Sequence, residues 1–144
     1  IDTWVHLAVN PDSPCVFTQG IERLELPVRH GEGKFVTEPD DMQRLADAGQ
    51  VVMRYADEEG RPAEGRWPEN PNGSLLDIAG ICDPTGRIFG LMPHPEAFHH
   101  VTNHPDWTRR KEQLAREGRA FEREEGDGVL VFRNAVAYAR EHLL

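Results

Sequence analysis

Residues 91–96 read Leu-Met-Pro-His-Pro-Glu, which places a histidine two positions before a glutamate, directly after an apolar stretch typical of a buried strand. A histidine with a pKa near neutral can take a proton from a thiol or a hydroxyl, and a nearby carboxylate can hold its tautomer and stabilise the imidazolium. Open α/β folds collect such groups at the carboxyl ends of strands. The motif predicts His94 as a general base oriented by Glu96; the structural alternative is a rigid, proline-fixed exit from a strand.

The nucleophile that such a base would serve is not evident in the sequence. Cys82 ends the apolar run Ile-Ala-Gly-Ile-Cys, where burial raises the pKa of a thiol, and no Gly-x-Cys-x-Gly elbow surrounds Cys15. We therefore expect neither cysteine to be a catalytic nucleophile. Two cysteines allow one disulfide, but so low a count is more typical of a reduced cytosolic protein.

A group of histidines follows Glu96; we call the turn at residues 93–97 the corner. His100 and His104 have the i, i+4 spacing of a paired-histidine zinc site, but Asn103 and Pro105 disfavour the continuous helix that such a site needs. We interpret these residues, with His99, as surface histidines and predict no metal site.

Two glycine-rich loops and a basic run are the remaining polar patterns. The loops, residues 30–34 and 70–74, lack the spacing of a P-loop or a dinucleotide fingerprint. The basic residues 109–111 follow Trp107, but acids surround them, so the pattern indicates a solvated helix face rather than a phosphate contact.

Strands must position these residues. Residues 4–9, 23–29 and 51–56 have strand composition or alternation, and Pro27 assigns residues 23–29 to an edge or an irregular position. Ile78–Cys82 and Arg87–Met92 are predicted to form a hairpin, because the intervening Asp-Pro-Thr-Gly matches a type I turn. Residues 57–74 are predicted to be a long loop.

Helices are expected in three places. Pro39 fits a first helical position and Gly49 a stop, and residues 109–125 have the charge of a solvated helix. A last helix is expected to be capped by Asp127. Its predicted buried face consists of four apolar residues, Val129, Phe132, Val136 and Ala139.

Composition limits the class of protein. With 144 residues and 38% apolar composition, the chain has the length and the core of one domain. Its 25 acidic and 16 basic residues, a net charge of −9, disfavour nucleic acid or an anionic membrane as a partner. No signal peptide is evident, and no apolar run approaches the roughly 18 residues that span a bilayer. We expect an intracellular, cytoplasmic α/β domain, and the missing initiator Met suggests a fragment or a processed product.

Several segments, in one order, resemble a known family. They resemble the glutaminase component of phosphoribosylformylglycinamidine synthase, one of the class I (triad) glutamine amidotransferases. The segments are Pro27–Phe35, Val52–Asp57, Asn70–Ser74, Ile78–Cys82, Gly90–Glu96 and the final Gly126–Ala135. The resemblance covers nearly the whole chain, and residues 58–69 and 99–125 look like family-variable insertions.

The resemblance implies a fold and site residues. Residues 1–144 would be a partial amidotransferase domain, the C-terminal half of a three-layer αβα fold (class α/β) with a β-hairpin and peripheral antiparallel strands. In that family a cysteine attacks the glutamine side-chain amide, giving a glutamyl thioester and ammonia; His94 would activate the cysteine, and Glu96 would orient His94. The two glycine-rich loops look like the substrate or partner rim, with His30, Gly31, Glu32, Gly33, Asn70 and Asn72 as its candidate residues.

The resemblance also implies partners. The ammonia would pass to a synthetase subunit, which would bind ATP and Mg and convert formylglycinamide ribonucleotide to the amidine in purine biosynthesis. No cofactor is expected in this chain.

One departure from the family is large. The nucleophile elbow and the oxyanion loop would lie in an N-terminal half preceding Ile1, which accounts for the scarcity of parallel strands. Without them we expect the chain to be an enzyme by family but inactive alone. Two alternatives stay open: a non-catalytic partner-docking domain with the same half-fold, and a metal-dependent hydrolase that uses the histidines.

Overall fold

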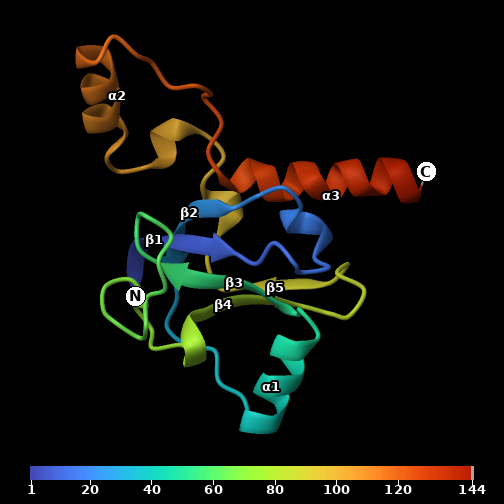
Figure 1. Cartoon of the computed structure of the whole chain (residues 1–144). Helices are drawn as coiled ribbons and strands as arrows, with labels where there is room; N and C mark the ends of the chain where they lie inside the picture. The colour runs from blue at the N-terminus through green and yellow to red at the C-terminus, as the bar shows by residue number, and fades with distance from the viewer. Residues whose placement is uncertain (144) are drawn as a thin grey trace.

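The computed structural model describes residues 1–143 as one antiparallel sheet with helices around it (Figure 1). The strands are β1 (Asp2–Val9), β2 (Arg23–Arg29), β3 (Val51–Ala56), β4 (Ile78–Cys82) and β5 (Phe89–Leu91). The helices are α1 (Pro39–Asp47), α2 (Trp107–Arg116) and α3 (Gly128–His142), with short 3₁₀ helices at Val16–Thr18, Leu75–Asp77, Pro95–Ala97 and Val101–Asn103. The strand order is β2-β1-β3-β4-β5, and each neighbouring pair is antiparallel.

The core lies on the sheet and is centred on β3. Five of the six residues of β3 are buried, as expected for an inner strand covered on both faces. In β1, by contrast, only Val5 and Leu7 are buried, and their spacing of two residues matches the side-chain alternation of a half-exposed strand. The predicted strands are thus confirmed, and the antiparallel pairing explains why strand–helix–strand crossovers are scarce.

The β4–β5 hairpin confirms the predicted turn. The backbone N–H of Gly86 donates to the Asp83 carbonyl at 3.0 Å, and the Asp83 carboxylate accepts from the Thr85 hydroxyl and from nearby backbone N–H groups. These hydrogen bonds, that of Thr85 first, lower the pKa of Asp83 to about 2. Gly86 has a φ of +69°, and a Cβ there would lie 1.9 Å from the Pro14 carbonyl oxygen, so only glycine fits. The hairpin brings the chain to the corner at His94.

The β2 edge of the sheet is closed by polar contacts. Glu25 donates its backbone N–H to the Asp127 carboxylate at 3.0 Å. Pro27 has no N–H to leave unpaired, and its carbonyl accepts the N–H of His94 at 2.8 Å. The edge position predicted from Pro27 is confirmed, and the corner itself is part of the closure.

Helix α1 begins and ends as the sequence predicts, but α3 does not pack as predicted. Pro39 is the first residue of α1, and Gly49, at φ +66°, follows its end. In α3 the predicted face is wrong, because Phe132 is 49% and Val136 is 51% exposed while Val131 is buried. Asp127 precedes α3 without a side-chain cap, since its carboxylate is used by β2.

Residues 99–127 form an arm between the corner and α3. Figure 1 shows α2, in orange, displaced from the sheet at the end of this arm, so the predicted charged helix is confirmed over residues 107–116 only. The Val101 N–H donates to the Glu124 carbonyl at 2.8 Å and joins the two ends of the arm. Among residues 1–143, none of the helices has the length and apolar character required to cross a membrane.

The start of α3 is pressed against the corner. A Cβ on Gly128 would lie 1.8 Å from the Pro95 carbonyl oxygen and 2.7 Å from that of Phe98. Because both neighbours are backbone, we expect Gly128→Ala to lower the free energy of unfolding by about 2 kcal/mol or more, measured by urea denaturation. Gly31→Ala is the matched control, because nothing lies within 4 Å of the added methyl group. Equal midpoints for the two variants would contradict the close packing.

Candidate functional site

The candidate site is centred on the corner that follows β5. Pro93 is fully buried, the His94 N–H is bonded to β2, and the Ala97 N–H donates to the His94 carbonyl at 3.2 Å. The backbone is therefore fixed while the two functional side chains stay accessible, His94 at 37% and Glu96 at 62% exposure. His94 directly precedes, and Glu96 lies within, a short 3₁₀ turn whose first residue, Pro95, has its φ preset.

The two side chains form one hydrogen-bonded pair. His94 Nδ1 lies 2.7 Å from Glu96 Oε1. Burial opposes ionisation of Glu96, but the hydrogen bond from His94, a backbone hydrogen bond and the charges of His94 and Arg29 together lower the pKa of this carboxyl. An ionised carboxylate only accepts, so the proton lies on Nδ1 and the lone pair of Nε2 is free to take another proton. The geometry is that of a general base and its orienting group.

The rim loop at residues 30–33 lies beside this pair. Burial lowers the pKa of His30, and the charge of His94 lowers it further. The amide of Asn72 holds the loop: its Nδ2 lies 3.1 Å from His30 Nε2 and 2.6 Å from the Gly33 carbonyl oxygen. Because that amide nitrogen donates, His30 Nε2 accepts, as a neutral ring can.

Tyr55 supports the same contact from β3. Its hydroxyl lies 3.2 Å from Asn72 Nδ2, and burial raises the pKa of Tyr55 to about 12. Gly33 is buried against the His30 ring, where a Cβ would lie 2.2 Å from the ring. The structure thus brings His30, Gly33 and Asn72 into one cluster near His94.

The other rim candidates occupy different positions. Gly31 and Glu32 are exposed at the tip of the loop. Asn70 is only 3% exposed, and its amide donates to the Ser74 carbonyl at 2.9 Å and to Asp77 Oδ1 at 2.8 Å. Its side chain therefore builds the 70–77 loop from inside and does not reach toward the corner.

Both cysteines are enclosed in the core. Cys15 is 0% and Cys82 3% exposed, and burial is the main cause that raises the pKa of each thiol. Ser13 lies between them, with its Oγ 3.8 Å from Cys82 Sγ and 3.4 Å from the Cys15 nitrogen. A buried, protonated thiol is a poor nucleophile, in agreement with the sequence analysis.

The sequence analysis expected all of these histidines on the surface, and this is wrong for His104. His104 is 4% exposed and lies 4.3 Å from the Trp4 ring, centroid to centroid. Its Nδ1 accepts the Asp106 N–H at 3.0 Å, so its Nε2 carries the hydrogen and donates to Glu25 Oε1 at 3.1 Å. Within residues 1–143, no three of the His, Cys, Asp and Glu side chains are grouped as a metal site.

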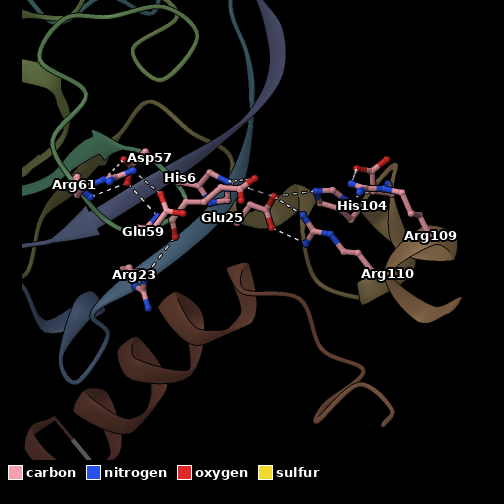
Figure 2. A network of polar contacts seen from close by, with 11 residues as sticks. His6, Arg23, Glu25, Asp57, Glu59, Arg61, His104, Arg109 and Arg110 are labelled. Atoms are coloured by element: carbon pink, nitrogen blue, oxygen red, sulfur yellow. Dashed lines mark hydrogen bonds and ion pairs between the residues drawn. The ribbon is translucent and has the colours of Figure 1, made fainter. Parts of the chain in front are cut away.

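Glu25 is the centre of a network that the sequence does not suggest (Figure 2). Arg110 donates to both carboxylate oxygens at 2.7 Å, and His104 donates to one of them. Burial opposes the charge of Glu25, but the hydrogen bonds and charge of Arg110, with His104 and His6, together lower the pKa of the carboxyl. The expectation that residues 109–111 form only a solvated face is therefore wrong for Arg110. The alternation of β2 gives no sign of this pairing, because it puts Glu25 on the face opposite the buried Leu24, Leu26 and Val28.

Comparison with known proteins decides the family. The family model described as the CobB/CobQ-like glutamine amidotransferase domain matches residues 1–139. The chain belongs to this family. The predicted fold, part of a class I glutamine amidotransferase, is confirmed by this match and by the structural comparison below.

Individual relatives share most of this chain but extend well beyond it. The phosphoribosylformylglycinamidine synthase subunit PurQ of Dehalococcoides mccartyi is 49% identical over 138 residues, which are 96% of this chain and 48% of that protein. PurQ of Methanococcus maripaludis is 46% identical over 135 residues, 94% of this chain and 49% of that protein. A chain in the structure of PurLQS from Thermotoga maritima matches with a TM-score of 0.57 and 29% identity, covering 96% of this chain and 47% of the other. The chain spans about half the length of these relatives.

The enclosed thiols generate a first prediction for the site. In the native protein, we expect Cys15 and Cys82 to resist a disulfide reagent such as DTNB at pH 8, because both are buried and protonated. Unfolding in guanidinium chloride should release both thiols, with glutathione as the reactivity control. Rapid labelling of Cys15 in the folded protein would restore it as a candidate nucleophile.

The lowered pKa of Glu25 generates a second prediction, on the pH dependence of stability. Its folded pKa is below the ordinary value of about 4.3, so its contribution to stability is fully present above that pH and is lost as the pH falls through the folded pKa. We expect Glu25→Gln to lose about 2 kcal/mol at pH 7 and to show a shallower acid decline, by urea unfolding from pH 3 to 7. Glu22→Gln, at an exposed position nearby, is the control. Identical pH profiles for Glu25→Gln and wild type would refute the pairing.

Proposed function

We propose that this chain is the His/Glu-bearing half of a glutamine amidotransferase that hydrolyses the glutamine side-chain amide and supplies ammonia to a synthetase partner. The observation that carries this proposal is the 2.7 Å pair of His94 and Glu96, with Nε2 free, in a chain of the amidotransferase family. The names of its PurQ relatives direct the proposal to phosphoribosylformylglycinamidine synthase and purine biosynthesis.

The proposed chemistry follows from the tautomer of His94. Nε2 takes the proton of a cysteine thiol, and the thiolate attacks the amide carbon of glutamine. The imidazolium, stabilised by Glu96, then gives its proton to the departing nitrogen, so that ammonia leaves and a glutamyl thioester remains. Water, deprotonated by the same Nε2, hydrolyses the thioester to glutamate and restores the thiol.

The nucleophile in this proposal lies outside the described residues. Cys15 and Cys82 are buried in the core, where Ser13 Oγ lies 3.8 Å from Cys82 Sγ and accepts the backbone N–H of Cys15. An elbow cysteine and oxyanion donors would come from a further half of the domain, and the PurQ relatives are about twice as long as this chain. The isolated chain is therefore proposed to be inactive.

The partner and the rim complete the proposal. The synthetase subunit would bind ATP and Mg and convert formylglycinamide ribonucleotide to the amidine with the ammonia. Of the rim candidates, His30 and Asn72 lie best for contact with glutamine, because their cluster adjoins His94. Gly31 and Glu32, exposed at the loop tip, are proposed for the partner face. A cytoplasmic location goes with this proposal.

A docking domain without catalysis is the second candidate. The exposed apolar residues of α3, Phe132 and Val136, favour it, because an unpaired apolar helix face indicates a surface that another body covers. The same face also fits the further half of an amidotransferase. The two candidates differ in whether His94 is needed for ammonia release.

Replacement of the base tests the function. In the complete amidotransferase with its synthetase, we expect His94→Ala to lower glutamine-dependent synthesis by about 100-fold or more, because general-base catalysis is worth that much. Synthesis with added ammonia should continue, since it bypasses the glutaminase site. The measurement is product formation with either nitrogen donor.

Two further results complete that experiment. Residues 1–144 alone should release no ammonia from glutamine, and turnover abolished by Cys15→Ala would overturn the placement of the nucleophile. Equal loss of both synthetic activities in His94→Ala would show that His94 is structural and favour the docking domain.

A further inference from the structure

We infer that Arg110, acting through Glu25, is a positioning residue for the His94–Glu96 pair. The inference rests on the proposed function. It extends that function to the arm, residues 99–127, because Arg110 belongs to the arm and not to the corner. Arg110 lies on α2 and Glu25 on β2, and they meet in two hydrogen bonds of 2.7 Å (Figure 2).

The functional pair depends on its backbone for its position. Both side chains are more than a third exposed, so the surrounding core does not hold them. The corner has three anchors instead. The His94 N–H is bonded to Pro27 on β2, the Phe98 ring packs edge-on against Trp4 of β1 at 4.9 Å, and the Gly128 N–H of α3 is bonded to the Phe98 carbonyl at 3.0 Å.

The Glu25 network reaches all three anchors. Glu25 lies on β2, two residues before Pro27 and on the same face of the strand. Its carboxylate fixes His104, whose ring packs against Trp4 at 4.3 Å. Its backbone N–H is bonded to Asp127, the residue before α3. A displaced Glu25 would therefore disturb each support of the corner at once.

Arg110 is the principal hold on Glu25 from the arm. None of the residues of α2 is buried, so apolar packing does not fasten this helix to the sheet. The Glu25 side chain is only 15% exposed, and a carboxylate so enclosed needs a paired cation. The bidentate contact also fixes direction, because both guanidinium nitrogens must face both carboxylate oxygens. The ion pair thus sets where the arm, and with it Phe98 and Asp127, lies against β2.

The test uses the complete amidotransferase with its synthetase. We expect Arg110→Met to lower the glutamine-dependent kcat by about ten- to a hundredfold, the cost of a misplaced catalytic group. The KM for glutamine should stay within about twofold of wild type, because the residues proposed to contact glutamine, His30 and Asn72, lie on the rim loops and not on the corner. Ammonia-dependent synthesis should be unchanged. Arg109→Met is the matched control, since Arg109 is 70% exposed and pairs with Asp106 on the arm itself.

A double variant separates positioning from stability. Arg110→Met alone leaves the charged Glu25 without its cationic partner and can unfold the protein. The double variant Glu25→Gln with Arg110→Met removes both charges and should recover thermal stability. If Arg110 positions the corner, the double variant stays impaired in glutamine-dependent kcat. Recovery of that kcat along with stability would overturn the inference, as would an equal loss of ammonia-dependent synthesis.

His94→Ala, measured in parallel, distinguishes the two proposals. A fully active His94→Ala variant would defeat the proposed function itself. If His94→Ala has lost glutamine-dependent synthesis while Arg110→Met retains it at the wild-type rate, only the positioning role is contradicted.

Discussion

A carboxylate enclosed at the edge of the sheet constrains much of this structure. Glu25 lies on the face of β2 opposite the buried Leu24, Leu26 and Val28, yet its side chain is only 15% exposed. An unpaired charge there would be costly, so its partners must come from elsewhere in the chain. Arg110 and His104 supply them from 85 and 79 residues away. The arm is thereby folded back over β2, and its two ends are brought to the corner at His94 and to the start of α3. The placement of one ion pair thus determines the surroundings of the functional pair.

The edge of β2 is closed by segments that follow it in the chain. A free strand edge offers unpaired N–H and C=O groups to any other strand. Here the Asp127 carboxylate takes one N–H, Pro27 lacks another, and the N–H of His94 uses the Pro27 carbonyl. The corner that carries the base therefore also terminates the sheet. Local strain or movement at this edge would be transmitted directly to the backbone of His94.

The sequence predicts the features whose determinants lie within a few residues of one another along the chain. Alternation along residues 23–29, the Asp-Pro-Thr-Gly turn and the Pro39 and Gly49 signals act within a few residues, and the structure has all of these elements. The His94–Glu96 pair is similarly local, two positions apart. The burial of His104 and the pairing of Arg110 depend on β2 and cannot be read from their neighbours. The same holds for α3, where Val131 rather than Phe132 packs inward.

The accessibility of the base and the burial of the thiols lead to one conclusion together. A general base acts only on a group within hydrogen-bonding reach, and an orienting carboxylate adds nothing unless the base has such a partner. His94 points its free Nε2 away from Glu96 on an exposed turn, whereas Cys15 and Cys82 are enclosed on the sheet with raised pKa values. In the proposed function, the nucleophile that the pair serves comes from outside the described residues. In the proposed function, precise placement of the corner matters more than its burial, because the half that carries the nucleophile would close over it.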